Sequence, residues 1–484
     1  MCKKIAYRLF SLYLVFLIVV LGGCHQTSES SELTETSTSI TSGVDDNETT
    51  TQTKDYSTQG GGSSQVNSST ISNNLSDPTT TASKSKQTTT SISNTTQTSN
   101  LSDTVFAQRL ASEKQKLNNI AASQTAFKAI DSLDGTGDYA RIANVMRKAK
   151  RGEKVTVGIL GDSICYGAGA SSTYRGFAAL INNWWTNVFG YENINYVNAS
   201  IGSNSLTNIV HRMDDDLLSH NPDIVIFGVH CFHDSTDDSI AMESIIKRML
   251  DRNIAVLCVV LTTSNGANDH TRLAPVAQHY NVPVVSFANA FVKSGLSWQT
   301  IGKDYIHPND VGHSLISLCV NNLFTNIGDS LKSHSPLPKP LPSTTYQTNG
   351  LRYVKATLWD RNDSKNITFT EKVSFVNYDK KMTQFRTYKG WASTTTVSSL
   401  VAKLPKISSL HLMFCYNNMA GTAYVTLTTQ SGRELCKDIA VNTNKPSQDG
   451  YSWNSKLLAA NIGEPVTVSI RSEGKIFLLG FMVT

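Results

Sequence analysis

A serine, a histidine and an aspartate in two short segments have the residue types and spacing that ester hydrolysis requires. Ser163 follows the apolar run Val155–Leu160, and Asp304 and His307 stand three residues apart much further along the chain. A serine hydroxyl is a poor nucleophile at neutral pH unless a base takes its proton, which a histidine does well when a carboxylate fixes its tautomer. The i, i+3 spacing lets Asp304 reach the ring nitrogen of His307 that faces away from Ser163. These side chains therefore predict a nucleophile, a general base and its orienting partner.

Short apolar runs alternate with helical patterns from about residue 137 onward, and these elements must position the three side chains. The expected strands are Val155–Leu160, Ile194–Val197, Asp223–Gly228, Ile254–Leu261 and Pro283–Phe287. The expected helices are Tyr174–Val188, Ser239–Leu250, Ala274–Tyr280 and a last one from about Asp310 to Phe324. Uniformly apolar strands that alternate with helices predict a parallel sheet covered on both faces. In such sheets the chemistry lies in loops at the carboxyl ends of the strands.

Four ordered sequence blocks carry these loops within residues 137–326. They read AKRGEKVTVGILGDSICYGAGAS, NYVNASIG, DDDLLSHNPDIVIFGV and DYIHPNDVGH. The blocks resemble those of the SGNH (GDSL-type) hydrolases, and the resemblance implies a three-layer α/β fold. It also implies that Ser163 is the nucleophile, His307 the general base and Asp304 its orienting partner. No Gly-x-Ser-x-Gly surrounds Ser163, which argues against the ordinary α/β-hydrolase elbow.

The resemblance also predicts an oxyanion hole, with one departure from the family pattern. The family uses the backbone N–H of the serine, a backbone N–H in the second block and an Asn side chain in the third. Here these donors correspond to Ser163, to Gly202 or Ser203, and to His230 in place of Asn. A histidine N–H can donate a hydrogen bond, but losing one good donor costs roughly 2.7–4 kcal/mol of transition-state stabilisation. The sequence therefore leaves open that the enzyme has only weak activity.

Two competing interpretations apply to these residues. Ser163 alone would be a turn or helix-cap serine, but the downstream Asp-x-x-His favours catalysis because the roles are predicted jointly. His230, His233 and Asp234 have a spacing that suits zinc. Since no further cluster accompanies them, the sequence favours no metal site there.

The first 105 residues carry signals for targeting and tethering. Residues 1–23 begin with positively charged residues and continue as an apolar run that ends at Leu21, which predicts a secretory signal. The junction 21–24 resembles the bacterial lipobox, with Cys24 as the lipidated residue. The alternative is an uncleaved anchor with an incidental cysteine. Ser and Thr make up 40 of the 79 residues 26–104. A segment of this composition has too little apolar surface to offset the loss of chain entropy on folding, so residues 24–105 are predicted to be a disordered stalk. No later apolar run has transmembrane length, which excludes a multi-span membrane protein.

Residues 336–484 differ in charge and pattern from the predicted hydrolase domain, 106–335. Their net charge is +9, against −1 for the hydrolase domain. A Pro-rich hinge opens the segment, and alternating β-branched residues with turn signals predict an all-β, sandwich-like accessory domain. The expected strands are 351–358, 371–378, 410–416, 423–429, 434–441, 466–471 and 475–483. Five aromatic residues either stack on sugars or form the core: Trp359, Tyr388, Trp391, Tyr451 and Trp453.

Together these features predict a serine esterase that removes acetyl groups from O-acetylated polysaccharide through an acyl-enzyme on Ser163. The expected location is the extracellular face of a bacterial cell membrane, with a lipid anchor at Cys24. Two alternatives stay open, namely acyl transfer to a glycan hydroxyl and a weakened SGNH module that binds wall or glycan. We expect no cofactor and no nucleic-acid partner, while the positive charge of 336–484 suits an anionic wall polymer.

Overall fold

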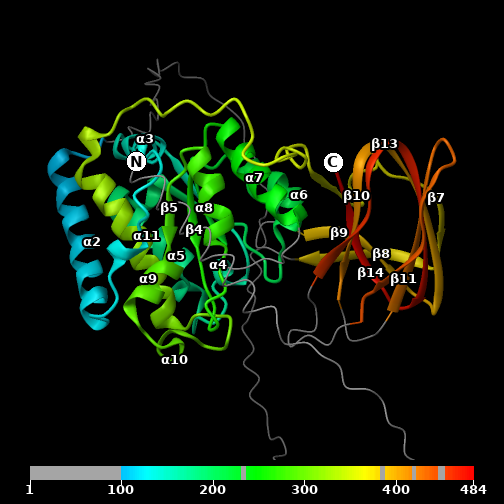
Figure 1. Cartoon of the computed structure of the whole chain (residues 1–484), viewed down its shortest axis with the longest axis horizontal. Coiled ribbons are helices and arrows are strands. Elements are labelled where there is room, and N and C mark those ends of the chain that lie inside the picture. Colours follow the sequence, from blue (N-terminus) through cyan, green and yellow to red (C-terminus); the bar gives the residue numbers. More distant parts are fainter. Residues whose placement is uncertain (1–99, 230–235, 382–386, 417–420, 445–452) are drawn as a thin grey trace, which may run out of the picture. The chain divides into compact units, whose positions relative to one another are not determined.

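The computed structural model describes residues 100–229, 236–381, 387–416, 421–444 and 453–484. Within them an α/β region is followed by an all-β module that begins at β6 (Thr357–Trp359) (Figure 1). The predicted signal segment, Cys24 and nearly all of the predicted stalk lie outside the described residues. None of the described helices has the length and apolarity needed to cross a membrane.

A five-stranded parallel sheet forms the centre of the α/β region. Its strand order is β2-β1-β3-β4-β5. The strands are β1 (Val155–Leu160), β2 (Ile194–Asn198), β3 (Ile224–Val229), β4 (Ala255–Val260) and β5 (Val284–Ser286). Every residue of β1 and β4 is buried, as a sheet covered on both faces requires. The predicted α/β class and its parallel sheet are confirmed.

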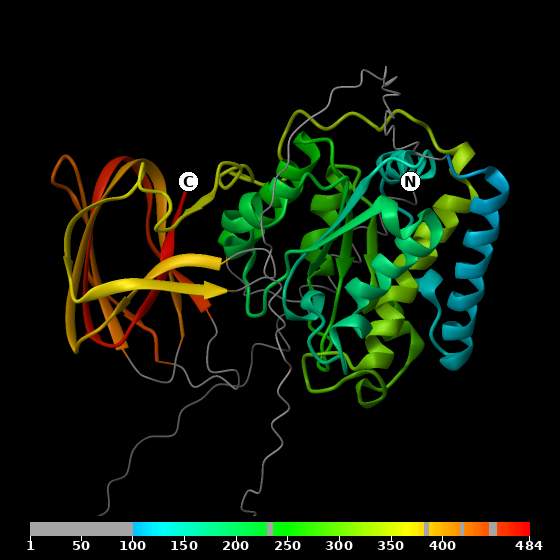
Figure 2. The ribbon, with the colours of Figure 1, turned by 180° about the vertical axis from the view of Figure 1, so that it is seen from behind.

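Helices cover both faces of this sheet (Figures 1 and 2). One face shares an apolar core with α2 (Asp103–Ser123), α3 (Ala140–Lys150), α5 (Phe177–Phe189), α9 (Phe287–Ser294) and α11 (Asp310–Asp329). The other face packs against α6 (Leu206–Asp216), α7 (Thr236–Asp251) and α8 (His270–His279). Two short helices, α4 (Ser163–Tyr166) and α10 (Trp298–Ile301), lie in connecting segments. The sequence analysis does not predict α2, whose first turn Ser102 caps.

The C-terminal module is an antiparallel structure built on two long strands, β10 (Val397–Cys415) and β13 (Trp453–Gly474). Their pairing has register shifts between Leu404 and Ser409, and such bulges bend strands. The other strands are β7 (Thr368–Val373), β8 (Phe375–Lys381), β9 (Thr387–Ser393), β11 (Gly421–Thr429), β12 (Glu434–Asn442) and β14 (Phe477–Val483). They enclose an apolar core of their own. The predicted all-β module is confirmed.

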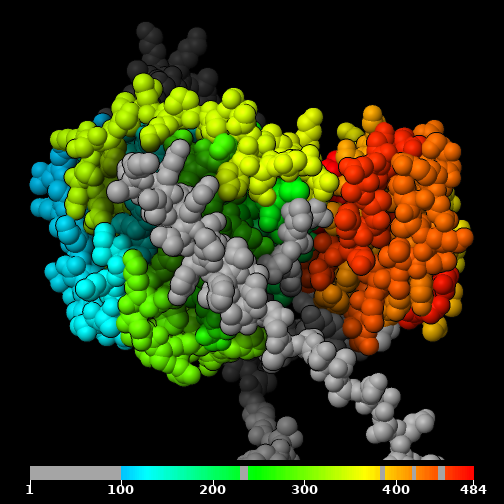
Figure 3. Space-filling view, viewed as in Figure 1, coloured from blue at the N-terminus to red at the C-terminus, as the bar shows by residue number. Residues whose placement is uncertain are grey.

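Two strand predictions in this part of the chain are wrong in detail. Residues 351–355 form turns because Tyr353 and Ala356 pack into the core of the α/β region. The strand predicted over 371–378 is divided into β7 and β8 at Ser374, whose φ of 57° turns the chain. The preceding Pro-rich segment runs along the surface of the α/β region (Figure 3), where the Lys339 N–H donates to Asp138 at 2.6 Å. The domain boundary placed at 335 stays a prediction.

Most of the aromatic residues considered as sugar platforms are core residues. Tyr388, Trp391 and Trp453 are at most 1% exposed. Trp359 is partly buried against the same core, and Tyr451 lies outside the described residues. Stacking on a sugar is therefore excluded for the three buried rings in this structure.

Candidate active site

Ser163 is the first residue of α4, just beyond the carboxyl end of β1. The Asp162 carboxylate caps this helix by accepting hydrogen bonds from the N–H groups of Ile164 at 2.9 Å and Cys165 at 3.3 Å. An Asp at this position satisfies N–H groups that the helix leaves unpaired. The capping role thus belongs to Asp162, and the Ser163 hydroxyl is available for other contacts.

The structure brings Ser163, His307 and Asp304 together in one hydrogen-bonded row. Nε2 of His307 lies 3.0 Å from Oγ of Ser163, and Nδ1 lies 2.9 Å from Oδ2 of Asp304. Both distances are within hydrogen-bond range. This is the arrangement in which a base can take the serine proton while a carboxylate orients the base.

The second carboxylate oxygen of Asp304 is held by the backbone. Its Oδ1 accepts from the N–H groups of Ile306 and His307, both at 2.8 Å. Burial raises the pKa of Asp304, but the hydrogen bonds from His307 and Ile306 outweigh that effect and hold the pKa below its ordinary value. The carboxylate is therefore ionised at neutral pH and keeps the imidazole proton on Nδ1.

A buried histidine on α11 supports the loop beside His307. Nε2 of His313 lies 3.0 Å from the Ala168 carbonyl oxygen, and Nδ1 accepts from the Phe177 N–H at 3.2 Å. Burial lowers the pKa of His313, so the ring is neutral with its proton on Nε2, as this pair of contacts requires. His313 thereby links α11 to both ends of the segment 168–177.

Gly169 in this loop packs against His307 and offers a direct test of the loop's role. Its φ is 90°, and a Cβ there would overlap the Pro308 carbonyl oxygen and lie 2.8 Å from Cβ of His307. We expect Gly169→Ala to lower kcat for an aryl acetate by about tenfold or more, because the base must shift from Ser163. Gly167→Ala is the matched control, since Gly167 also has a positive φ but its Cβ would meet only Gly176 Cα at 3.5 Å. Equal losses of kcat in the two variants would show that backbone strain, and not displacement of His307, is responsible.

The second predicted donor of the oxyanion hole lies in the loop after β2. A Cβ on Gly202 would lie 3.6 Å from Cβ of Ser163, and Ser203 follows with a φ of 58°. Among the described residues no acceptor is recorded for the N–H of Ser163 or of Gly202. The structure therefore brings Gly202 next to Ser163, whereas His230 lies outside the described residues.

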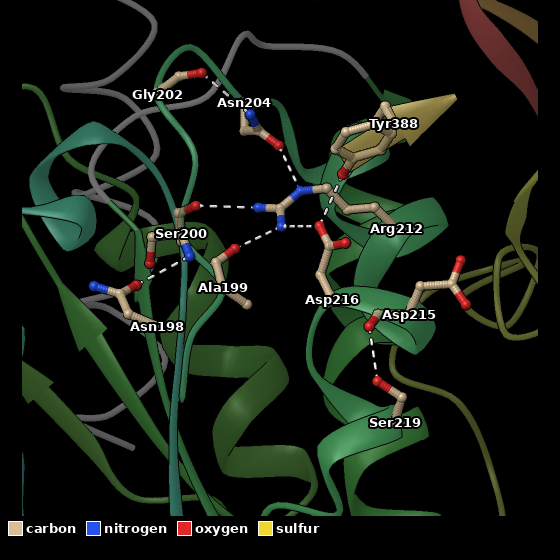
Figure 4. Close-up of polar contacts among 11 residues, drawn as sticks. Asn198, Ala199, Ser200, Gly202, Asn204, Arg212, Asp215, Asp216, Ser219 and Tyr388 are labelled. Atoms are coloured by element: carbon tan, nitrogen blue, oxygen red, sulfur yellow. Dashed lines mark hydrogen bonds and ion pairs between the residues drawn. The ribbon is translucent and has the colours of Figure 1, made fainter. Parts of the chain in front are cut away.

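Two buried residues that were not predicted from the sequence hold the Gly202 loop in place (Figure 4). Nδ2 of Asn204 donates to the Gly202 carbonyl oxygen at 3.2 Å, and Nε of Arg212 donates to Oδ1 of Asn204 at 2.8 Å. Both side chains are 1% exposed. Buried polar groups that are fully hydrogen-bonded rigidify the segments they join.

No group of three His, Cys, Asp or Glu residues within the described ranges could hold a metal ion. The His230, His233 and Asp234 spacing considered above lies outside those ranges.

A groove of about 710 Å³ lies against the segments that carry Ser163 and Gly202, since Tyr166 and Ser200 are among its lining residues. Its lining includes Tyr166, Tyr174, Tyr191, Asn182, Ser200 and Lys381. Tyr174 and Tyr191 are 81% and 83% exposed, while Oδ1 of Asn182 and Oγ of Ser200 are buried without a hydrogen-bond partner among the described residues. The groove thus offers exposed aromatic faces next to the segments that carry Ser163 and Gly202.

Residues 159–315 match the model of the GDSL-like Lipase/Acylhydrolase family. The chain carries a GDSL-like acylhydrolase domain. The matched range includes Ser163, Gly202, Asp304 and His307, so the SGNH resemblance of the four sequence blocks is confirmed. The protein is accordingly an ester-hydrolysing enzyme of the SGNH type.

Two solved structures resemble this chain across both of its regions. One is a two-domain esterase (CEX) active on acetylated mannans, at 21% identity and a TM-score of 0.60, covering 74% of this chain and 98% of that one. The other is that esterase co-crystallised with mannopentaose, at 21% identity and a TM-score of 0.59, with the same coverage. At this identity the likeness establishes a shared two-domain fold. The comparison with curated proteins finds no match.

Proposed function

We propose that the protein is a serine esterase that removes acetyl groups from an O-acetylated polysaccharide. The observation that carries the reaction type is the row of hydrogen bonds from Ser163 Oγ through His307 to Asp304, at 3.0 and 2.9 Å. A hydroxyl with an oriented base within reach is an activated nucleophile.

In the first half of the proposed reaction, Oγ of Ser163 attacks the ester carbonyl carbon while Nε2 of His307 takes the hydroxyl proton. The carbonyl oxygen becomes negatively charged, and the N–H groups of Ser163 and Gly202 stabilise it. Collapse of this intermediate breaks the bond between the carbonyl carbon and the sugar oxygen. The departing sugar oxygen takes the proton from His307, and an acetyl group remains on Ser163.

In the second half, water replaces the sugar. His307 takes a proton from the water as its oxygen attacks the acetyl carbonyl carbon, and the same N–H groups stabilise the second intermediate. Collapse releases acetate, and the proton on His307 returns to Oγ of Ser163. Asp304 stays ionised throughout and stabilises the imidazolium that forms in each half.

The groove beside the site supports a polymeric carbohydrate as the substrate. Exposed tyrosine rings offer flat apolar faces with a polar edge, which match the faces of sugar rings, and Lys381 supplies hydrogen-bond donors from the C-terminal module. The CEX esterase of the same fold acts on acetylated mannans. We therefore choose acetylated mannan as the first polymer to test.

Removing one groove ring should separate polymer binding from chemistry. We expect Tyr174→Ala to raise KM for acetylated mannan by about fivefold, because one aromatic contact contributes about 1 kcal/mol. KM for an aryl acetate, which is too short to reach the ring, should not change. Tyr346→Ala is the control, since Tyr346 is 49% exposed and lies outside the groove. An unchanged KM for the polymer in Tyr174→Ala would contradict the assignment of the groove.

Whether water or a sugar hydroxyl accepts the acetyl group is tested by measuring free acetate and the acetylated sugar. The full-length protein is incubated with acetylated mannan, and free acetate is measured with and without an added unacetylated mannan oligosaccharide. Hydrolysis predicts acetate equal to the ester lost in both samples. Acetyl groups appearing on the oligosaccharide at the expense of acetate would replace hydrolysis by acyl transfer.

We also propose that the enzyme is held at the extracellular face of a bacterial cell membrane through a lipid on Cys24. The positively charged start, the apolar run ending at Leu21 and the small residues before Cys24 support this location. The Ser/Thr-rich segment would then act as a stalk, and the basic C-terminal module could lie against anionic wall polymers. Cys24→Ala in a producing cell should move the enzyme from the membrane fraction, and retention there would overturn the anchor.

A further inference from the structure

A buried arginine links the two segments that carry the proposed oxyanion-hole donors. Arg212, on α6, is 1% exposed. Its Nη1 donates to the Ala199 carbonyl oxygen at 2.5 Å and its Nη2 to the Gly161 carbonyl oxygen at 3.4 Å, while Nε binds Asn204 as described above. Gly161 lies two residues before Ser163, and Ala199 and Asn204 flank Gly202. One rigid guanidinium therefore sets the spacing between the Ser163 segment and the Gly202 loop.

The charge of Arg212 is balanced one helical turn later by Asp216, which is fully buried. Oδ2 of Asp216 accepts from Nη1 of Arg212 at 2.9 Å. The same oxygen accepts from the hydroxyl of Tyr388 at 2.8 Å. Tyr388 lies on β9 of the C-terminal module and is also fully buried. Figure 4 shows the row of contacts from Tyr388 through Asp216 and Arg212 to Asn204 and Gly202.

A second contact joins the same loop to the module without using these polar groups. Ile201, which directly precedes Gly202, is 4% exposed and belongs to an apolar cluster whose other members all come from the module. Tyr388, Trp453 and Phe477 are among them. The loop is thus held on its polar side by Arg212 and on its apolar side by the module.

We propose that the C-terminal module is part of the catalytic apparatus, with Tyr388, Asp216 and Arg212 as positioning residues for the oxyanion hole. Tyr388 orients Asp216, Asp216 orients Arg212, and Arg212 fixes the loop that presents the Gly202 N–H to the substrate. The proposal rests on the role given to Gly202 in the proposed function. It assigns the module a part in turnover of every ester, including those too small to touch the groove.

The test compares steady-state hydrolysis of an aryl acetate by full-length variants. Tyr388→Phe keeps the ring and removes only the hydroxyl, so kcat should fall about tenfold with KM unchanged, because a displaced donor weakens the transition state more than substrate binding. Arg212→Lys has a single nitrogen in place of a planar group that binds four acceptors in different directions, and should lower kcat about 100-fold. Tyr388→Phe decides the question if Arg212→Lys fails to fold.

Two controls in the module separate positioning from loss of stability. Tyr424→Phe removes a hydroxyl that binds Glu473 at 3.2 Å on the module's own strands, and kcat should stay at the wild-type value. Val468→Ala opens the module's core, where Val468 is fully buried, and should lower Tm without lowering kcat at a temperature where both proteins are folded. Wild-type kcat in folded Tyr388→Phe, or an equal loss in Val468→Ala, would overturn the proposal.

A different experimental result would contradict the proposed function. If wild type and Ser163→Ala hydrolyse the aryl acetate at equal rates, the assignment of the nucleophile is wrong, whatever the Tyr388 variant does. If Ser163→Ala is inactive while Tyr388→Phe keeps full kcat, the function stands and only the positioning role is lost. The rate at which a fluorophosphonate modifies Ser163 can be compared between wild type and Tyr388→Phe as a second measurement. This reaction also places negative charge in the oxyanion hole.

Discussion

Ser163→Ala is expected to lower kcat for an aryl acetate and for acetylated mannan by roughly 10⁴ to 10⁶-fold. The alanine variant keeps the oxyanion-hole donors but has no oxygen to form the acetyl-enzyme. The residual rate would come from water activated by His307 and from substrate binding. The measurement is initial-rate acetate release, together with mass spectrometry of the wild type for an acetylated Ser163 during turnover.

The fold of this variant should be intact. Asp162, and not Ser163, caps α4, and the Ser163 hydroxyl makes its recorded contact with His307. Tm should therefore stay within about 2 °C of the wild type, since ordinary surface changes are usually within about 0.5 kcal/mol. Ser219→Ala, which removes a hydroxyl bound to the Asp215 carbonyl oxygen at 2.7 Å on the exposed surface, should keep full activity. A Ser163→Ala protein with wild-type rates would refute the serine mechanism.

The hydrogen-bonded row of Ser163, His307 and Asp304 was predictable because its signals are local. Apolar β1 followed by Gly-Asp-Ser places Ser163 at a strand end, and the Asp-x-x-His spacing brings Asp304 to His307 within one loop. Only the contact between Ser163 and His307 needs the whole fold, because it joins the end of β1 to the segment that precedes α11. The sequence was therefore enough to predict that these three side chains come together, while their catalytic roles stay a proposal.

The support behind the oxyanion hole was not predictable from the sequence. Asp216 ends an acidic run of three residues, a pattern typical of an exposed helix end, yet it is fully buried because Arg212 and Tyr388 both bind it. Tyr388 was considered as a sugar platform for its residue type alone. The contact between Tyr388 and Asp216 joins residues 172 positions apart, and neither periodicity nor spacing encodes such a partner.

The long strands of the module show a second limit. The sequence pattern predicts only the later part of β10, over 410–416, and only part of the second half of β13, over 466–471. The remaining parts lose the alternation of apolar and polar residues at the bulges near Leu404 and Ser409, because each extra residue reverses the face that the next side chain occupies. Strand existence was thus predictable, while strand length depended on tertiary pairing.

Asp304→Asn is expected to lower kcat by about 10³ to 10⁴-fold while leaving the fold and KM for an aryl acetate largely unchanged. Oδ1 of Asp304 accepts from two backbone N–H groups at 2.8 Å, so the Asn oxygen must stay there and its NH₂ group must face Nδ1 of His307. The NH₂ group can only donate, which forces the imidazole proton onto Nε2. A protonated Nε2 cannot accept the hydrogen of Ser163, and the base is therefore lost.

The control for Asp304→Asn is a second carboxylate on the same stretch of chain. Asp310 binds the Ser171 N–H at 2.7 Å and forms an exposed ion pair with Arg175 at 3.1 Å. Such a pair contributes about 0–1 kcal/mol, so Asp310→Asn should change kcat for the aryl acetate less than about fivefold. The decisive comparison is the ratio of the two kcat values at equal folded fraction, checked by circular dichroism. Similar losses in both variants would mean that Asp304 acts through the loop's charge or fold, whereas a loss confined to Asp304→Asn requires the tautomer that its carboxylate imposes on His307.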